Sequence, residues 1–313
     1  MAHRLAGGIA AVLLLGASCG EPAPSEPTSP SPAGDPVPVV EYPVTITDDD
    51  GVEVTIDAEP QRIVTFAPSM TEIVFALGLG DRLVGVSGPF DDFPAEATEI
   101  EQVGGAGDFG VDPNVEKVVS LDPDLFLTIP GGDQWKQRLR DLDVPVVTLH
   151  ADDLPNLLAD IETIGRIAGV PEEGLGLVDR MGSGIEEVEA QAEASGGVSC
   201  FFEVYYPPLT TIGPDTFIFD LLERAGCDPV TAGATSDYPE WSVDELVADG
   251  PEVYFVTPES AKSVEAIAGR PGFGAIPAVE DGNVVLVDGD LVTRAGPRVV
   301  DGLRQLAEGL EAA

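Results

Sequence analysis

Positive charge is scarce in this sequence. Its 313 residues include 15 lysines and arginines, of which only three are lysines, against 56 aspartates and glutamates, so the formal net charge at pH 7 is −41. A surface with this charge repels nucleic acid and anionic lipid, and we expect neither as a direct partner. Such a surface favours solubility and suits a high-salt habitat, where salt screens the repulsion between acidic side chains.

Histidine and cysteine are also rare. The chain contains two histidines, His3 and His150, and three cysteines. A serine or cysteine nucleophile needs a histidine beside it, and a zinc or manganese site draws on several His or Cys ligands. We expect a surface or packing role for His150, because it ends a predicted strand. The sequence therefore predicts no enzyme, no resident cofactor and no metal site, and the alternative from another class is a secreted hydrolase or chelate-modifying enzyme.

No apolar run in the sequence reaches the roughly 20 residues that a transmembrane helix needs. Residues 5–17 form a shorter run after Arg4, and the sequence Ser18-Cys19-Gly20 follows them. This pattern resembles the lipobox of bacterial lipoproteins, although Gly16 stands where the lipobox prefers Leu. An ordinary secretory signal with an incidental cysteine is the alternative. We interpret residues 1–19 as a lipoprotein signal peptide with lipidation at Cys19, which predicts an exported protein anchored by lipid at the outer face of the cytoplasmic membrane.

A proline-rich segment follows this signal. Residues 20–41 contain seven prolines among Ser, Thr, Ala, Glu and Asp. Such a composition builds no core and favours extended polyproline II structure. We interpret the segment as a disordered tether between the lipid and the folded part of the chain.

From residue 42 onward the pattern becomes that of an α/β protein. The segment 44–56 alternates apolar and polar residues about Asp50-Gly51, which predicts a β-hairpin. The strand "RIVTFA" then leads into a helix for which Ser69 and Glu72 form a predicted capping box. Further strands and helices alternate along the chain, which predicts mostly parallel sheets with helices on their faces. The predicted elements that follow are strand 82–86, helix 113–120, strand 124–128, helix 134–142 and strand 144–149.

The second half of the chain repeats this plan. Residues 116–130 align without gaps on residues 244–258, and each half also has a strand followed by a helix that ends in glycine, at Gly78 and Gly226. The sequence between the halves keeps a helical rhythm, broken at Gly169-Val170-Pro171. The predicted fold is thus two similar α/β lobes joined by a long, rigid helical connector, with a ligand cleft between the lobes. The predicted boundaries are 42–151 for the N-terminal lobe, 152–197 for the connector and 198–313 for the C-terminal lobe.

Aromatic residues gather in the loops after predicted strands or before predicted helices. Open α/β sheets bind ligands at this carboxyl edge, so these loops predict an apolar cleft for a sizeable ligand. Each aromatic residue taken alone could equally pack locally. The predicted cleft residues are Pro68, Ser69, Phe90, Phe109, Tyr205, Tyr206, Tyr238, Trp241 and Arg294.

Two further features leave alternatives open. Arg294 and Arg298, two of the few cations, precede the last helix and could meet an anionic ligand group, or Arg298 could form a surface ion pair. Cys200 begins a predicted strand and Cys227 ends the helix that follows it. Because a crossover helix returns near the start of its strand, a disulfide is feasible, and two separate buried thiols are the alternative.

Several blocks of this sequence look like those of a known family. "RIVTFAPSMTEIVFALGLGDRLVGVS", "VGGAGDFGVDPNVEKVVSLDPDLFLT", "TTIGPDTFIFDLLERAGC" and "YPEWSVDELVADGPEVYFV" resemble, in collinear order, the class III (helical-backbone) substrate-binding proteins of ABC importers for ferric siderophores, haem and cobalamin. The likeness spans about residues 44–310. It implies two lobes with the ligand between them, no catalysis, and an ABC permease and its ATPase subunits as partners of a protein that we expect to be a monomer.

The resemblance also carries over individual residues. Family members present one acidic residue per lobe to the permease, and Glu116 and Glu223 occupy those places. "YPEW" and "YYPP" are similar to cobalamin binders, whereas Phe109 and Ile129-Pro130 stand where those proteins often carry tryptophan, and the hairpin at 44–56 is commoner in the siderophore branch. The acidic surface weighs against a strongly anionic ligand. The resemblance therefore implies a metal chelate, with cobalamin or a related corrinoid ahead of a ferric siderophore or haem.

Overall fold

A computed structural model describes residues 40–104 and 112–313 of this chain. These residues belong to a single compact unit, which begins at Pro38. The signal peptide, the lipidation site Cys19 and nearly all of the predicted tether lie outside the described residues, as does Phe109. Among the residues described, no helix is both long and apolar enough to span a membrane.

The predicted hairpin is the first described element. Strands β1 (Val44–Thr47) and β2 (Glu53–Ile56) pair antiparallel, with Val44 opposite Ile56. Gly51 in the turn has φ of 74°, a backbone conformation that glycine adopts without steric cost. The hairpin side chains alternate between buried and exposed, which confirms the alternation in the sequence.

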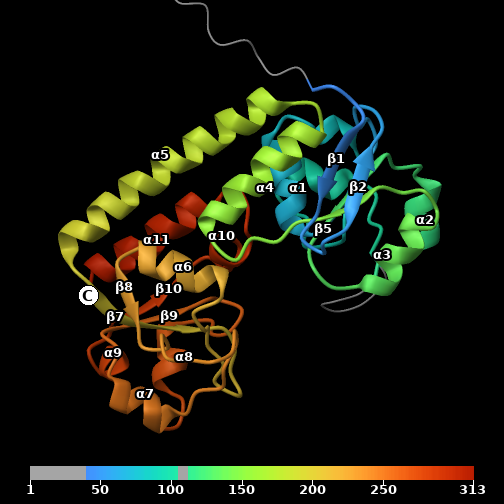
Figure 1. The fold of residues 1–313 in the computed structure, drawn as a ribbon. Coiled ribbons are helices and arrows are strands. Elements are labelled where there is room, and N and C mark those ends of the chain that lie inside the picture. The colour runs from blue at the N-terminus through green and yellow to red at the C-terminus, as the bar shows by residue number, and fades with distance from the viewer. Residues whose placement is uncertain (1–39, 105–111) are drawn as a thin grey trace, which may run out of the picture. The chain divides into compact units, whose positions relative to one another are not determined.

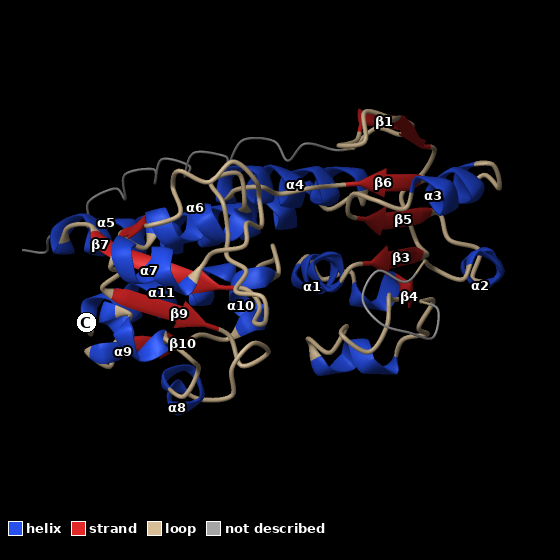
Figure 2. Cartoon of the chain, turned by 90° about the horizontal axis from the view of Figure 1, so that it is seen from below, coloured by secondary structure: helices blue, strands red, loops and turns tan. Residues whose placement is uncertain are grey.

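The N-terminal lobe, which Figure 1 shows with its helices α1, α2 and α3, contains a four-stranded sheet in the order β4-β3-β5-β6 (Figure 2), and every pair in it is parallel. Its strands are β3 (Ile63–Phe66), β4 (Leu83–Gly85), β5 (Leu125–Thr128) and β6 (Val146–Thr148). Its helices are α1 (Pro68–Ala76), α2 (Val115–Ser120) and α3 (Asp133–Arg140), with short 3-10 turns η1 (Gly80–Arg82) and η2 (Ala95–Glu99). The alternation of strands and helices is therefore confirmed.

The C-terminal lobe contains a second parallel sheet, in the order β10-β9-β7-β8. Its strands are β7 (Val198–Glu203), β8 (Cys227–Pro229), β9 (Val253–Val256) and β10 (Val284–Leu286). Its helical segments are α6 (Phe217–Arg224), α7 (Val243–Asp249), α8 (Val264–Ala268), η3 (Phe273–Ala275), α9 (Pro277–Glu280), α10 (Gly289–Thr293) and α11 (Val299–Glu311).

The two sheets share one topology, which confirms the internal repeat. Strands β3, β4, β5 and β6 of the first lobe occupy the same places as β7, β8, β9 and β10 of the second. The 128-residue offset read from the sequence carries β5 onto β9 residue for residue, and it carries the start of α2 onto the start of α7. Gly78 and Gly226, which follow α1 and α6, have φ values of 76° and 94°.

Two helices connect the lobes, as the sequence predicts. Helix α4 (Leu154–Ile167) and helix α5 (Pro171–Ser195) meet at Gly169 and Val170, and Pro171 occupies the first turn of α5. At 1.5 Å per residue, the 25 residues of α5 extend about 37 Å. A methyl group on Gly165 would lie 2.9 Å from the Cα of Gly174, so the absence of side chains at these two residues lets the two helices pack closely.

A continuous hydrophobic core joins both lobes through this connector. Alternate residues of each central strand face opposite sides of its sheet, as the period of a strand requires. Leu125 and Leu127 of β5, Val253 and Phe255 of β9, and Ile161 of α4 belong to one buried cluster. The opposite sheet faces form two separate cores, around Phe126 in the N-terminal lobe and Tyr254 in the C-terminal lobe. The connector is thus packed into the protein and is not a free linker.

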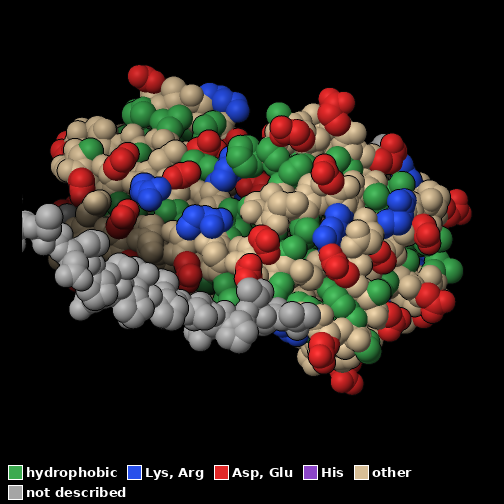
Figure 3. Space-filling view, turned by 90° about the horizontal axis from the view of Figure 1, so that it is seen from above, with side chains coloured by type: hydrophobic (Ala, Val, Ile, Leu, Met, Phe, Trp, Pro, Cys, Tyr) green, Lys and Arg blue, Asp and Glu red, His purple; other side chains and the backbone are tan. Residues whose placement is uncertain are grey.

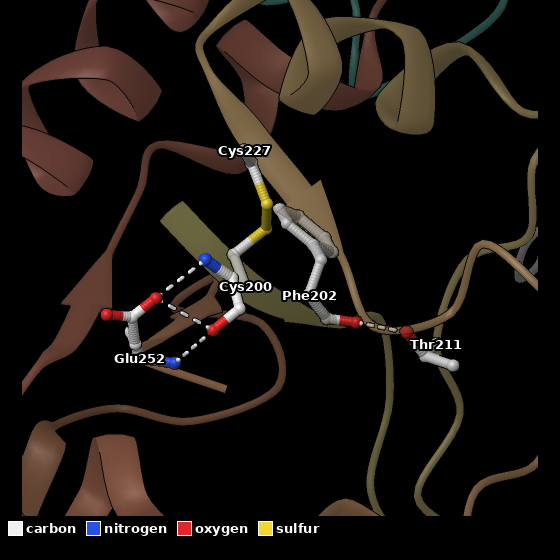
Figure 4. Close-up of a disulfide and its surroundings, with 6 residues drawn as sticks. Cys200, Phe202, Thr211, Cys227 and Glu252 are labelled. Atoms are coloured by element: carbon white, nitrogen blue, oxygen red, sulfur yellow. Dashed lines mark hydrogen bonds between the residues drawn. A yellow bond between two sulfur atoms is a disulfide. The ribbon is translucent and has the colours of Figure 1, made fainter. Parts of the chain in front are cut away.

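The two cysteines whose pairing the sequence left open form a disulfide (Figure 4). Cys200 lies in β7 and Cys227 begins β8, so the bridge links two neighbouring parallel strands, with their Cα atoms 5.8 Å apart. Both residues are buried in the core that the lobes share. Because the bond closes the strand–helix–strand unit, it limits the freedom of that unit in the unfolded chain.

The predicted capping box at the start of α1 is wrong. The helix begins at Pro68 after Ala67, and no side chain caps it. Ser69 and Glu72 lie inside the helix, where Glu72 binds arginines of the other lobe instead of its own backbone. Proline has no backbone N–H, so a helix that begins with proline has one amide fewer to cap. The start signal of α1 is therefore Pro68, one residue before the predicted cap Ser69.

Candidate functional site

The carboxyl edges of the two sheets face each other. In Figure 2 the arrowheads of β3, β5 and β6 point toward the C-terminal lobe, and those of β7 and β9 point toward the N-terminal lobe. Loops that follow these strands therefore meet between the lobes, where open α/β sheets bind their ligands. The aromatic residues that the sequence assigned to a cleft follow or precede these edges.

In the C-terminal lobe, two of these aromatics present their side chains to solvent. Tyr205 is 54% exposed and Tyr238 is 59% exposed, which is unusual for large rings. Tyr205 pairs with Thr210 across a short turn, and Thr210 in turn pairs with Glu240, so the two loops that carry the tyrosines are joined. The pKa of the Tyr238 phenol is raised by partial burial and by the negative charges of Asp237 and Asp152. The phenol is therefore protonated at neutral pH.

In the N-terminal lobe, Phe90 and Phe93 are 53% and 43% exposed. Their loop is fixed by the buried Asp91, which accepts hydrogen bonds from the Thr71 and Ser87 hydroxyls and, at 2.8 Å, from the amide of Gly88. Each lobe thus supplies exposed rings from a loop that is held by hydrogen bonds.

Tyr206 and Trp241 differ from their neighbours. Both pack against the second-lobe core, and the Trp241 indole N–H donates to Asp249 at 2.9 Å. The ring of Tyr206 stands edge-on to Phe273, with centroids 5.2 Å apart. These two residues therefore support the loops, and the exposed rings beside them are better placed to touch a ligand.

Arg294, which the sequence places among the cleft residues as a cation that could meet an anionic ligand group, forms ion pairs within the protein. Arg294 binds Glu72 at 3.2 Å, Asp92 at 3.1 Å and Asp290 at 2.7 Å. Arg298 binds both carboxylate oxygens of Glu72, at 2.9 and 2.6 Å, so it does form an ion pair, and that pair is only partly exposed. Both arginines already have their charge matched by carboxylates.

These ion pairs connect the two lobes. Glu72 lies on α1 of the N-terminal lobe and is 3% exposed, whereas the arginines precede α11 of the C-terminal lobe. The guanidinium of Arg298 also lies 4.0 Å from the centroid of the Phe93 ring. We call Glu72, Asp92, Arg294 and Arg298 the interlobe cluster.

The loop between Arg294 and Arg298 also covers the start of α1. Ser69 is only 9% exposed, and a methyl group on Gly296 would lie 3.8 Å from its Cα. Pro68 is partly buried. The loop before α11 therefore lies over this helix end, and Ser69 does not form the open cleft wall that the sequence suggested.

A cavity of about 510 Å³ opens beside the interlobe cluster. It is lined from both lobes, and none of the eight predicted cleft residues that the structure describes lines it. The lining residues are Glu72, Phe75, Ala76, Gly78, Gly80, Asp81, Phe93, Pro94, Glu96, Pro297 and Arg298. Phe93 belongs to the same loop as the exposed Phe90, so this cavity adjoins one aromatic edge of the predicted cleft.

The described residues offer no metal centre and little for nucleophilic catalysis. Within residues 40–104 and 112–313, no group of three His, Cys, Asp or Glu side chains is arranged to hold a metal ion. His150 is exposed, and its imidazole lies 2.6 Å from the carboxylate of Asp152. Both cysteines in this part of the chain are in the disulfide.

Comparison with known proteins decides the family. Residues 63–291 match the periplasmic binding protein family, which is most of the folded part. The chain belongs to the periplasmic binding protein family. This confirms the family resemblance seen in the sequence and agrees with the two-lobed fold.

Individual members of the periplasmic binding protein family show the same likeness. An uncharacterized ABC transporter substrate-binding lipoprotein, YvrC of Bacillus subtilis, is 36% identical over 312 residues, which cover 96% of this chain and 94% of that protein. The crystal structure of the periplasmic vitamin B12 binding protein BtuF of Vibrio cholerae matches with a TM-score of 0.72 and 25% identity, over 81% of this chain and 98% of that one. A possible iron-binding (periplasmic solute-binding) protein from Staphylococcus epidermidis matches with a TM-score of 0.71 and 28% identity, over 80% and 99%.

The two acidic residues that the family resemblance selected for docking lie on different lobes of this periplasmic binding protein. Glu116 is in the first turn of α2 and Glu223 is near the end of α6, and both are exposed. Neither carboxylate forms an ion pair within the described part of the chain. The internal repeat, however, places Asp244, exposed in the first turn of α7, at the position equivalent to Glu116.

Sequence analysis did not identify the roles of four residues of the site. Glu72, Asp91 and Glu203 are buried carboxylates, and Arg270 is the partner of Glu203. The signal that could have found two of them is an acidic residue within an apolar run, as in "MTEIVF" and "CFFEVYY", because a buried carboxylate requires a partner. Their partners lie far along the chain, and residues so far apart in the sequence could not be paired without the fold.

Acidic side chains are spread over much of the face seen in Figure 3, with few lysines and arginines among them. On this face the negative charge is spread over many side chains, in agreement with the acidic composition of the chain. A surface of this kind repels anions.

Proposed function

We propose that this protein is a lipid-anchored receptor of an ABC importer, which captures a metal chelate between its lobes and delivers it to the membrane permease. The proposal rests on family membership, on the similarity to a protein named as an ABC transporter substrate-binding lipoprotein, and on the Cys19 pattern. The proposed organisation keeps the boundaries given above: signal peptide 1–19, tether 20–41, lobes 42–151 and 198–313, and connector 152–197.

The ligand that we place first is cobalamin or a related corrinoid. The observation that carries this choice is the set of exposed rings on the facing edges of the lobes, Phe90 and Phe93 on one and Tyr205 and Tyr238 on the other. Large flat ligands bury such rings on binding, and aromatic groups dominate the energy of such contacts. The similarity to a vitamin B12 binding protein supports the same choice.

The charge of the site supports a ligand that is not strongly anionic. Arg294 and Arg298 are held by carboxylates, so binding an anion to them would first break those ion pairs. The remaining surface carries a large negative charge. A corrinoid, whose outer surface is mostly neutral amide groups, meets less repulsion here than a chelate with several carboxylates.

The alternative ligand is a ferric siderophore or haem. Lys262, exposed in the loop after β9, forms no ion pair with another described residue and offers a cation near the carboxyl edge of the second sheet. The exposed phenols of Tyr205 and Tyr238 are groups that can ligate haem iron. The similarity to a possible iron-binding protein agrees with this alternative.

One titration tests the ligand. The purified protein is mixed with cyanocobalamin, haem or a panel of ferric siderophores, and tryptophan fluorescence is followed. Trp241 lies beside the aromatic loops, whereas Trp135 is buried in the first lobe, so quenching should fall strongly in a Trp241→Phe variant. We expect saturable quenching by cyanocobalamin. Binding of haem or a siderophore alone would replace the corrinoid by the alternative, and no binding by any of them would overturn the chelate proposal.

A second experiment tests docking to the permease. Reversing the charge of Glu116 and Glu223 together to lysine should abolish uptake by cells while leaving ligand affinity unchanged, because both residues are exposed and lie on helices α2 and α6, not in the aromatic loops. A matched pair, Glu116→Lys with Asp244→Lys, tests the position that the internal repeat selects. If uptake by the first pair stays undiminished and the second pair fails, Asp244 and not Glu223 makes the contact in the second lobe. Undiminished uptake by both pairs would refute docking through these helices.

A further inference from the structure

Beneath the exposed tyrosines of the C-terminal lobe lies a carboxylate with no contact to solvent. Glu203, the last residue of β7, is 0% exposed. It accepts hydrogen bonds from the Tyr254 and Ser260 hydroxyls, and the Nη1 atom of Arg270 donates to it at 2.5 Å. Burial and the Glu203 carboxylate both raise the pKa of Tyr254, which keeps that phenol protonated as a donor.

Arg270 occupies the space between this carboxylate and two rings. Its guanidinium carbon lies 4.2 Å from the centroid of Tyr206 and 5.1 Å from that of Phe273. A second nitrogen donates to the carbonyl of Ser260 at 3.3 Å. A planar guanidinium can stack on a ring and pair with a carboxylate at the same time, which the ammonium of lysine cannot do.

Tyr206 connects Arg270 to the loop that carries Tyr205. It directly follows Tyr205, and the Thr210 amide donates to the Tyr205 carbonyl at 2.9 Å. The Trp241 amide donates to the Leu209 carbonyl at 2.9 Å, which ties the segment that carries Tyr238 to the same loop. A chain of contacts thus runs from the buried Glu203 through Arg270 and Tyr206 to both exposed tyrosines.

We propose that Glu203 and Arg270 are positioning residues of the ligand site, which hold Tyr205 and Tyr238 in place before the ligand arrives. The inference rests on the proposed function and extends it, because these two residues touch the loops and not the ligand. Rings held in their binding positions lose less conformational freedom on complex formation, so a fixed loop binds more tightly than a loose one.

The variant that tests this is Arg270→Met, which keeps the length of the side chain and removes its charge and plane. The matched control is Arg140→Met, because Arg140 is also mostly buried (19% exposed) and pairs with a fully buried carboxylate, Asp48, but lies in the N-terminal lobe away from the tyrosines. A double variant that combines Glu203→Gln with Arg270→Met is a second test. It removes both charges of the ion pair, so it leaves no unpaired carboxylate in the core.

Two measurements are made on each variant: hydrogen exchange of the loop amides of Thr210 and Trp241, and the dissociation constant for cyanocobalamin. We expect Arg270→Met and the double variant to speed exchange at both amides and to weaken binding about tenfold, as loss of preorganisation at a binding loop does. Arg270→Lys should be intermediate. Tyr206→Phe, which keeps the ring, should behave as the unaltered protein, whereas Tyr206→Leu should behave as Arg270→Met. The Arg140→Met control should change neither measurement at these residues.

The outcomes separate this proposal from the proposed function. Unchanged loop exchange in Arg270→Met overturns the positioning role whatever the ligand is. Faster exchange with unchanged affinity also overturns it, because the pair would then be structural only. If the unaltered protein binds no chelate, the proposed function fails, and the exchange data still decide whether Arg270 holds the tyrosine loop.

Discussion

Asp160 is a buried acid whose chemistry has a measurable effect on stability. It lies in α4 with 8% of its surface exposed, and burial, followed by the nearby Asp49, raises its pKa from 3.8 to about 7. The folded protein therefore binds this proton more tightly than the unfolded chain does. Between about pH 4 and pH 7 the folded state holds more protons, so its stability falls as the pH rises through that window.

Replacement of Asp160 by asparagine should remove this pH dependence. We expect Asp160→Asn to raise the free energy of unfolding by about 1–3 kcal/mol at pH 8, and to have little effect at pH 4, where the native aspartate is already protonated. Urea unfolding at both pH values measures the difference. Asp179→Asn, at an exposed residue of α5, is the control. Equal stabilisation at pH 4 and pH 8 would contradict the pKa assignment.

Single residues were the part of the site least visible in the sequence. The exposed rings Phe90, Tyr205 and Tyr238 could be named, because loops after strands are recognisable from their position alone. The residues beneath them could not. Arg270 is 67 positions from Glu203, and Arg298 is 226 positions from Glu72, and side chains so far apart meet only through the fold.

At the level of elements, sequence and structure agree closely, except that Cys227, which the sequence assigned to the end of a helix, begins strand β8, since α6 ends at Arg224. Every central strand of both sheets was anticipated, because short apolar runs between helices are typical of buried parallel strands. The helix starts were less certain. Helix α2 begins at Val115 and not at residue 113 as predicted, because Asn114 caps it: its side chain accepts a hydrogen bond from the Lys117 amide at 3.0 Å. A cap depends on one rotamer of one side chain, whereas a strand is specified by several residues at once.

The connector shows the same contrast. Its helical rhythm and its break at Gly169 predicted two helices, and α4 and α5 have those bounds within a few residues. The close approach of the helices at Gly165 and Gly174 could not be predicted, because it depends on which faces of the two helices meet. Because of this contact, the two connector helices pack against each other as part of the core.

For the molecule as a whole, the interlobe cluster is a second connection between the lobes beside the helices. It joins residues more than 200 positions apart, and Glu72 at its centre is nearly fully buried. The Glu72 carboxylate forms ion pairs with Arg294 and Arg298. Removal of this carboxylate would leave the partly buried arginine charges without that partner, which is destabilising. The cluster should therefore fix the angle between the lobes.

Replacement of Glu72 by glutamine tests that role. We expect Glu72→Gln to lower the free energy of unfolding by about 2–4 kcal/mol, as loss of a buried ion-pair partner does, and to broaden the distances between the lobes. Spin labels at the exposed residues Ser120 and Glu280 measure those distances. Glu59→Gln breaks the Arg82 ion pair within one lobe and is the matched control. An unchanged distance distribution in Glu72→Gln would show that the connector alone fixes the lobes.

The two lobes share a strand order but differ where their first strand ends. In the N-terminal lobe, β3 ends at Phe66 and α1 begins at Pro68, whereas in the C-terminal lobe β7 ends at Glu203 and α6 begins only at Phe217. The extra chain in the second lobe is the segment that carries Tyr205 and Tyr206. A repeated scaffold with one lengthened loop can change part of its ligand contact through that loop while the sheets, the connector and the shared core stay as they are. Among proteins built on this scaffold, we expect the segment of about a dozen residues between β7 and α6 to vary more in length and sequence than the sheets do.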